Sequence, residues 1–329
     1  MIVLDVVLNI LSSGLPCVLL ALGIFLTYRL LDFADLTAEG SFLIGAAVSG
    51  VLIINGVNPW IATLASIGSG FLCGLVTGVL NRYLKIPKLL SGIITLTASA
   101  SIAMLIMGAF KGNNSPFASV ISFTDIQPGG SAQTIYTLFY PWEFIPSINK
   151  YIVVSPWGDV IKVAVMLVVV FAAIAAIYLF FGTEYGMAIR ATGMNEKMAK
   201  SQGINVNVAT IMCVCLANAL IGLGGSLYAQ EAKTVSTISA TGYLVIGLAS
   251  ILIGEAIFGK RSFKVWLIAV AMGSIVYFVI ITIATRLGLP TQLKSLLYAV
   301  LITLALCLPL FKEQIHNFRK KRAEENDSI

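Results

Sequence analysis

The stretch from Gly254 to Arg261 has a residue spacing close to that of a nucleotide-binding loop. It reads Gly-Glu-Ala-Ile-Phe-Gly-Lys-Arg, which approximates the loop in which glycines and a lysine bind phosphates while a Ser or Thr binds Mg²⁺. Arg261 stands where that hydroxyl is needed, and the stretch ends an apolar run instead of following a soluble strand. The sequence therefore predicts that this chain does not bind ATP and is not itself an enzyme.

Four carboxylates in or beside apolar runs are the next candidates for a functional role. Asp32, Asp35 and Glu39 cluster at the predicted cytoplasmic entry of the second apolar segment, and Glu255 lies near the inner end of the seventh. A carboxylate at such a depth is costly unless it is solvated or paired, so each is a candidate for a translocation pathway. In the alternative interpretation they cap helices or pair with nearby cations, namely Arg29, Lys260 or Arg261.

The remaining reactive side chains give no catalytic or metal-binding pattern. The one histidine, His316, sits in a basic tail without a second candidate ligand. The five cysteines lie inside apolar runs and lack zinc or disulfide spacing, so we interpret them as structural thiols: Cys17, Cys73, Cys213, Cys215 and Cys307.

The composition assigns these residues to a membrane protein. Hydrophobic residues make up 58% of the 329 residues and charged residues only 11%, against about 25% charged in an ordinary soluble domain. The net charge of +6 comes from basic residues in short loops and the tail, which indicates membrane topology and not a nucleic-acid partner. The sequence predicts one polytopic domain in a lipid bilayer, over residues 1–311, followed by a basic cytoplasmic tail, 312–329.

The expected fold class is all-α, a transmembrane helical bundle. Because the N-terminus lacks the basic region of a signal peptide, the first apolar run is expected to be retained as a span. Most runs approach the ~20 residues that cross a bilayer. They give about nine segments, near 6–27, 38–54, 59–80, 89–111, 160–182, 207–229, 242–258, 264–286 and 295–311.

The basic residues in the connections predict the orientation, because Lys and Arg accumulate on the cytoplasmic side. Connections 81–88, 183–206 and 259–264 are basic and share a side with the tail, whereas 55–58, 112–159, 230–241 and 287–294 are poorer in basic residues. We therefore expect a multi-pass protein of the bacterial cytoplasmic (inner) membrane with its N-terminus outside and its C-terminus in the cytoplasm.

A weak internal repeat suggests a 4+1+4 arrangement. Residues 40–45 resemble 242–247, and residues 82–87 resemble 286–290. An offset of five segments would give the two halves opposite orientations, as in transporters with inverted repeats, although matches this short also arise by chance. Segments two and seven are the shortest of their halves and contain glycine, which is where discontinuous helices lining a pathway are expected.

Small residues at close-packing spacing occupy the third segment. Glycines and other small residues recur from Gly68 to Gly78 and allow two backbones to approach closely. Ordinary packing within one subunit is the favoured interpretation, and a dimer face is the alternative.

The longest internal connection, 183–206, is polar, helical in pattern and cytoplasmic by the charge count. Glu184 and Arg190 bracket a first helical stretch, Gly193 is expected to break it, and Asn195 is expected to cap a second helix that stops at Gly203. Joining two spans needs only a few residues, so this loop is expected to do more than connect, although a merely solvated amphipathic loop stays open.

This loop resembles the coupling loop of ATP-binding-cassette (ABC) importer permeases of the ribose and branched-chain amino acid type. The matching pattern is Gly-x-Ala-x-Arg-Ala-x-Gly-x-Asn followed by Ala and a Gly-Ile pair, here Gly186, Ala188, Arg190, Ala191, Gly193, Asn195, Ala199, Gly203 and Ile204. The stretch from Tyr28 to Phe42 resembles the arm of that group associated with tryptophan-type or other amino-acid uptake. The long external loop 112–159 departs from the family pattern.

The resemblance implies a permease subunit that carries a small polar solute, an amino acid, inward. Its partners would be a separate ABC ATPase, which holds ATP and Mg²⁺, an extracytoplasmic substrate-binding protein, and a second permease copy. This chain would bind no cofactor or metal. The residues expected to couple to the ATPase are Glu184, Tyr185, Gly186, Arg190, Ala191, Gly193, Asn195, Ala199, Gly203 and Ile204.

The expected pathway lies at the two short segments, where helix N-termini near 35–37 and 239–241 would offer N–H groups to a substrate carboxylate. An ion- or proton-coupled secondary transporter is the runner-up, but few charges lie mid-span. A non-transporting scaffold is a third interpretation. The candidate pathway residues are Asp35, Thr37, Glu39, Gly45, Thr241, Gly247 and Glu255.

Overall fold

The computed structural model describes residues 2–109, 117–123, 134–136, 143–145, 150–152, 158–237, 242–259 and 262–286, together with residues 300 and 303. Its long helices are α1 (Ile2–Phe25), α2 (Thr37–Ile54), α3 (Pro59–Arg82), α4 (Lys88–Gly108), α6 (Gly158–Phe180), α9 (Val206–Ala232), α10 (Tyr243–Phe258) and α11 (Phe263–Arg286). The shorter helices are the π-helix η1 (Leu26–Leu30), α7 (Glu184–Met194) and α8 (Glu196–Ser201).

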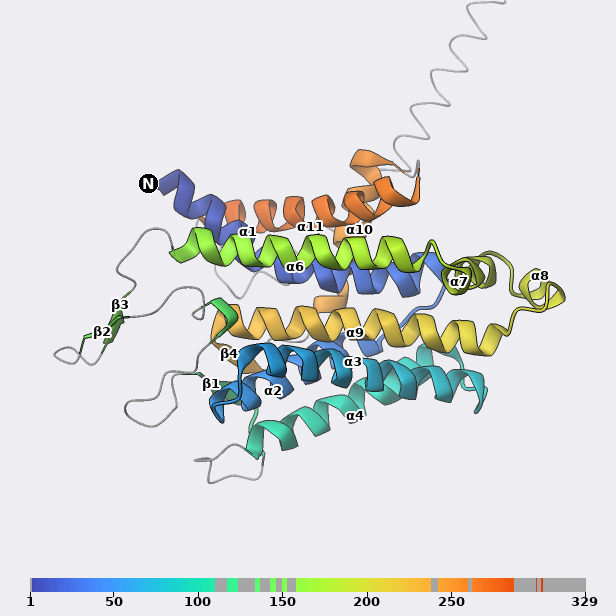
Figure 1. Cartoon of the computed structure of the whole chain (residues 1–329), viewed down its shortest axis with the longest axis horizontal. Coiled ribbons are helices and arrows are strands. Elements are labelled where there is room, and N and C mark those ends of the chain that lie inside the picture. The colour runs from blue at the N-terminus through green and yellow to red at the C-terminus, as the bar shows by residue number, and fades with distance from the viewer. Residues whose placement is uncertain are drawn as a thin grey trace, which may run out of the picture.

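Helix α9 is the central element of the bundle (Figure 1). It runs between one layer that contains α1, α6 and α11 and another that contains α2, α3 and α4. Helix α1 is almost completely buried, whereas α4 and α6 expose most of their apolar side chains, as helices that face lipid do. This arrangement agrees with the predicted membrane bundle.

Seven of the described helices are long and apolar enough to cross a membrane, and α10 is shorter. Eight of the nine predicted segments coincide with described helices to within a few residues. The ninth, 295–311, falls almost entirely outside the described residues, so the count of nine stays a prediction, as does the inverted repeat. Helices α2, with 18 residues, and α10, with 16, are the shortest of the apolar helices described, as predicted.

Helices α3 and α9 are in direct backbone contact. A methyl group at Gly70 would overlap the Asn218 carbonyl oxygen, and one at Gly222 would approach the Ser66 carbonyl oxygen closer than a side chain tolerates. Glycine lets the two backbones meet at these points. These residues therefore pack the helices of one subunit together, as favoured from the sequence. Gly68, in contrast, faces open space, and a dimer face here stays a prediction.

Short strands correct the expectation of a purely helical fold. Strand β1 (Val120–Ser122) pairs antiparallel with β4 (Thr234–Ser236), with Ile121 opposite Val235. Strand β2 (Glu143–Ile145) pairs antiparallel with β3 (Lys150–Ile152). Three-residue strands are too short to show an alternating pattern in the sequence, so only the tertiary pairing reveals them.

The two ends of the bundle differ. The four strands and the start of α1 lie at one end, and α7 and α8 lie at the other (Figure 1). Arg82 at the end of α3 donates to Glu196 of α8 at 2.8 Å, and the Arg190 guanidinium lies 5.3 Å from the ring centroid of Phe263 at the start of α11. The three basic connections therefore meet at one end, as predicted. Which side of the membrane this end faces stays a prediction.

Candidate functional site

The α7–α8 helix pair is built from local capping signals. The Thr183 hydroxyl accepts from the Gly186 N–H at 3.4 Å at the start of α7, and the Asn195 side chain accepts from the Met198 N–H at 3.1 Å at the start of α8. Gly203 follows α8 with a φ of +81°, a conformation that favours glycine. The predicted Asn195 cap and Gly203 stop are therefore confirmed.

The predicted helix break at Gly193 is wrong. Gly193 lies within the last turn of α7, and the break falls at Asn195, whose backbone is extended. A methyl group at Gly193 would overlap the carbonyl oxygen of Leu30 in η1. Glycine is needed here because α7 rests directly on the backbone of η1, and not because the chain turns.

Arg190 fixes α7 to its neighbours. Its Nη2 donates to the carbonyl oxygen of Phe181, just after α6, at 2.7 Å, and its guanidinium stacks over the ring of Phe263. Arg190 and Glu184 are both described, and no ion pair joins them. A guanidinium hydrogen-bonded to a carbonyl and stacked on a ring is well ordered.

The outer surface of the α7–α8 pair is apolar. Met194 is 89% exposed, and Tyr185, Met187 and Met198 are also exposed. Clustered exposed apolar side chains mark interaction sites. Of the predicted coupling residues, the exposed ones are Glu184, Tyr185, Asn195 and Gly203; the buried ones are Gly186 and Ala199; the half-buried ones are Arg190, Ala191, Gly193 and Ile204.

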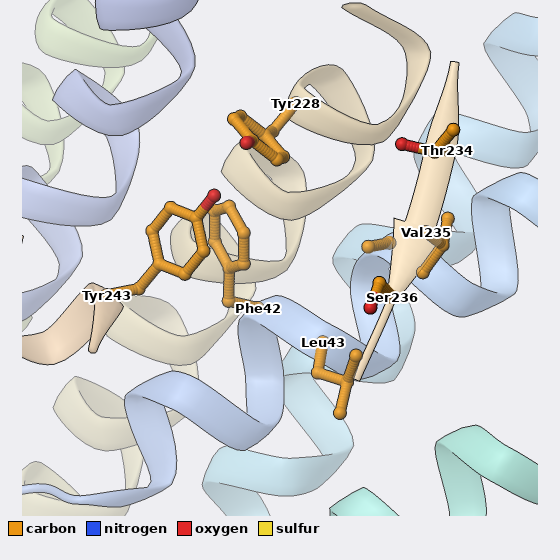
Figure 2. Close-up of a pocket in the computed structure, with 8 residues that line it drawn as sticks. Phe42, Leu43, Tyr228, Thr234, Val235, Ser236 and Tyr243 are labelled. Atoms are coloured by element: carbon orange, nitrogen blue, oxygen red, sulfur yellow. The ribbon is translucent and has the colours of Figure 1, made fainter. Parts of the chain in front are cut away.

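A pocket with aromatic walls lies near the opposite end, between α2, α9, α10 and β4 (Figure 2). The rings of Phe42 and Tyr243 stack with centroids 4.3 Å apart, and the Tyr228 ring meets Tyr243 edge-on at 5.4 Å. Thr234 and Ser236 of β4 line the other side (Figure 2). Aromatic walls with a few hydroxyl groups suit a small solute that carries a ring.

Asp35 lies deep in the bundle, which corrects its predicted place at the cytoplasmic entry. Its carboxylate accepts from the Asn218 amide at 2.7 Å and from the Thr37 N–H at 2.9 Å. The Ser41 hydroxyl donates to the Asn218 side-chain oxygen at 2.7 Å. Asn218 lies about 12 Å along α9 from Thr210, which bonds Arg82 at the end of α3. Helix α2 thus begins inside the bundle, as a discontinuous helix would.

Glu39 occupies the N-terminus of α10. One of its carboxylate oxygens accepts from the Gly242 N–H at 2.9 Å and from the Leu244 N–H at 3.3 Å. Since Asp35 caps α2 in the same way, protein carboxylates fill both helix N-termini that we expected to receive a substrate carboxylate. The alternative role as helix caps is therefore confirmed for Asp35 and Glu39, and a role of these residues in the pathway stays a prediction.

Four other predicted pathway residues, Thr37, Gly45, Gly247 and Glu255, are described and lie outside the pocket lining. Gly45 meets the backbone of Gly222 in α9, and Gly247 meets the Ile24 side chain. Glu255 pairs with Arg29, one of the partners considered from the sequence. The hydroxyls of Thr37 and Thr77 lie 2.7 Å apart, and Thr241 lies outside the described residues.

A further group of charges lies at the end of α9, outside the pocket lining. Lys162 of α6 contacts Glu231 at 3.2 Å. Burial lowers the pKa of the Lys233 ammonium, and the neighbouring positive charge of Lys162 lowers that pKa further, while Glu231 opposes the shift. The Lys233 carbonyl oxygen accepts from the Phe123 N–H at 3.0 Å, which ties the β1 segment to α9.

Sequence reasoning missed several residues of these sites, among them Asn218, Tyr228 and Tyr243. Asn218 is a buried amide in an apolar span, and a polar group in such a place is a functional candidate by default. Tyr228 and Tyr243 carry a weaker signal, because a single tyrosine in a span also occurs as packing. Their convergence depends on the tertiary fold.

The buried apolar bundle with discontinuous helices, the exposed helix pair at one end and the pocket near the other define a membrane permease. Residues 6–306 match the family described as the branched-chain amino acid transport system permease component, and the chain belongs to this family of ABC-type permeases.

Relatives with different transport names resemble the chain over most of its length. It is 33% identical to a tyrosine transport system permease protein of Clostridioides difficile, over 90% of this chain and 89% of the relative. It is 25% identical to a nucleoside ABC transporter permease protein of Lactococcus lactis, over 76% and 75%. It is 22% identical to the ribose import permease protein of Escherichia coli, over 90% and 80%. No solved structure matches the chain.

Proposed function

We propose that this chain is the membrane-spanning subunit of an ABC importer that moves an amino acid inward with ATP hydrolysed by a separate subunit. The observation that carries the proposal is the α7–α8 pair, which presents an apolar surface at the end of a bundle of the permease family. The chain itself binds no cofactor, and ATP and Mg²⁺ belong to the partner ATPase.

The α7–α8 pair suits an ATPase for a physical reason. Coupling requires an element that moves as a unit when its partner changes state. Arg190 holds α7 to α6 and α11, and Gly193 seats it on η1, while Tyr185 and Met194 remain free to enter a partner's cleft. An extracytoplasmic binding protein would deliver solute at the strand end, and a second permease copy would complete the transporter in the bacterial inner membrane.

The pocket favours an aromatic amino acid as the solute. Phe42, Tyr228 and Tyr243 already pack against one another, and a solute ring placed against this cluster gains an aromatic contact as well as area burial. The relative with 33% identity is named for tyrosine transport. Two other relatives, with 22% and 25% identity, are named for ribose and nucleoside transport. A sugar or a nucleoside is therefore the competing hypothesis for the solute.

The docking test replaces exposed apolar residues by charge. Met194→Glu should lower co-purification of the candidate ATPase at least tenfold, because it puts a charge in a contact that needs apolar surface. Val120→Glu, at a residue exposed to 54% on β1 at the opposite end, is the matched control and should keep wild-type association. Equal association of both variants and wild type would remove the docking role.

The solute test uses the permease, its ATPase and its binding protein reconstituted in vesicles. Radiolabelled tyrosine, leucine, ribose and guanosine are offered in turn with ATP. We expect uptake of tyrosine above leucine, and none of ribose or guanosine. Uptake of ribose or guanosine instead would keep the ABC permease and overturn the amino-acid proposal. Uptake that continues without ATP would overturn the importer itself.

A further inference from the structure

The π-helix η1 lies between the α7–α8 pair and the cytoplasmic-side ends of α10 and α11. It extends α1 by five residues, Leu26–Leu30, and ends at the point where Gly193 of α7 meets the Leu30 carbonyl. Single π-turns are uncommon in helices and occur frequently at functional sites. Because Gly193 leaves no space between α7 and the end of η1, a displacement of α7 is passed to η1 as well as to the helices that Arg190 contacts.

Arg29 connects η1 to α10 and, through Glu255, to α11. Its Nη2 donates to one carboxylate oxygen of Glu255 in α10, and the other oxygen of Glu255 accepts from the Trp266 Nε1 of α11 at 2.9 Å. The Trp266 ring also meets Phe25, at the end of α1, edge-on with centroids 4.8 Å apart. One carboxylate thus joins three helices where they approach the α7–α8 end.

This ion pair is partly removed from solvent. The side chains of Arg29 and Glu255 are 25% and 8% exposed, so breaking the pair leaves a charge in a poorly solvated place. The Nε of Arg29 is buried and has no hydrogen-bond partner among the described residues. An arginine held with one donor unsatisfied is fixed by its other contacts, here the carboxylate and the Tyr28 ring.

Helix α10 connects this pair to the pocket. Glu255 lies near its end, and Tyr243, which stacks on Phe42 in the pocket, is its first residue. The twelve steps along the helix from Tyr243 to Glu255 span about 18 Å. Gly254 and Gly273 place the backbones of α10 and α11 in direct contact, so the two helices move together. A shift at Glu255 is therefore delivered to Tyr243.

We propose that the Arg29–Glu255 pair transmits movement of the α7–α8 pair through η1 to α10 and so to the pocket. This inference rests on the proposed function as an ABC permease. Arg29 and Glu255 act as positioning residues that do not touch the solute. If η1 changes from a π-turn to an α-turn, one residue is removed from the turn, and the residues at its end, Arg29 among them, rotate about the helix axis by up to about 100°, which separates Arg29 from Glu255. The pair is then made in one transport state and broken in the other.

The test compares two ion pairs in the reconstituted complex of permease, ATPase and binding protein. Glu255→Gln keeps the shape of the side chain and should leave ATPase co-purification and ATP hydrolysis unchanged, while solute moved per ATP falls about tenfold. Arg29→Gln should lower the amount of solute moved per ATP in the same way. Arg29→Lys should lower it less, because this variant keeps a cation. The matched control is Lys162→Gln with Glu231→Gln, a pair of similar exposure at the other end, and its ratio should stay at the wild-type value.

A second measurement separates transmission from stability. In a chain whose only tryptophan is Trp266, its fluorescence should change when ATP is added to the wild-type complex, because Trp266 donates to Glu255. The change should disappear in Arg29→Gln. An unchanged transport ratio in Glu255→Gln, or an unchanged fluorescence response in Arg29→Gln, would overturn the relay. If the wild-type chain binds no ATPase, the proposed function fails and not the relay alone.

Discussion

The α7–α8 end and the strand end of this bundle are built in opposite ways. The α7–α8 surface comes from one continuous stretch of chain whose caps, Thr183 and Asn195, are local. The pocket draws on residues from α2, α9, β4 and α10, which are far apart in the sequence. The difference teaches that a docking surface can be inherited as a local motif, whereas a solute pocket is a product of the whole fold.

The first test of this contrast is an all-or-none measurement of which end faces outward. In a chain without native cysteines, Val120→Cys should react with a membrane-impermeant thiol reagent in intact cells, because β1 is expected outside. Met194→Cys, whose parent residue is 89% exposed, should react only after the membrane is opened. Labelling in the reverse order would invert the two ends and remove the docking role of α7–α8.

A methyl group added at the contact between α7 and η1 should have the next largest effect on transport. Gly193→Ala overlaps the Leu30 carbonyl and costs about 1–3 kcal/mol in backbone displacement, which should lower ATP-driven uptake tenfold or more. Membrane insertion should persist, since the spans are unchanged. The control is Gly68→Ala, which meets open space and should keep wild-type uptake. Equal uptake in both variants would show that α7 does not need its contact with η1.

At the strand end, loss of one ring should weaken solute binding moderately. Tyr243→Leu removes one ring of the pocket wall, and the loss of an aromatic contact with the solute worth about 0.5–1.5 kcal/mol should raise KM for tyrosine uptake about three- to tenfold while ATPase association stays unchanged. Tyr83→Leu, at an exposed tyrosine outside the pocket, is the control. A change in ATPase association with no change in KM would contradict the separation of the two ends.

The smallest effect concerns the ion pair between α3 and α8. The hydrogen bond from Arg82 lowers the pKa of Glu196, so this group stabilises the fold above its unfolded pKa and the contribution is lost as pH falls through the folded pKa. Because Glu196 is largely exposed, Glu196→Gln should cost at most about 1 kcal/mol at pH 7. Thermal unfolding of both proteins should show a difference at pH 7 that vanishes at strongly acidic pH.

The sequence predicted what depends on local patterns. Apolar runs located eight helices, and Asn195 and Gly203 marked the start and stop of α8. It failed where a residue's role depends on a distant backbone. Gly193 has the signal of a helix break, yet it serves a contact with Leu30, far away in the chain.

The depth of Asp35 could not be predicted for a related reason. Hydropathy places a carboxylate before an apolar run at the membrane surface, because an isolated charge would be too costly inside. The hydrogen bonds to Asn218 and Thr37 offset that cost; the Thr37 contact is local, but Asn218 becomes evident as a partner only when the helices are packed. The roles of the coupling and pathway residues in transport stay predictions.

The capping of α10 by Glu39 has a consequence for the electric potential along the pathway. A helix N-terminus carries roughly half a positive charge, and a full carboxylate placed on it more than cancels that charge. Next to Tyr243 the potential is then slightly negative, so it attracts the ammonium group of a zwitterion and repels phosphates and dicarboxylates. Under the proposed function, solutes would thereby be sorted by charge before any side chain tests their shape.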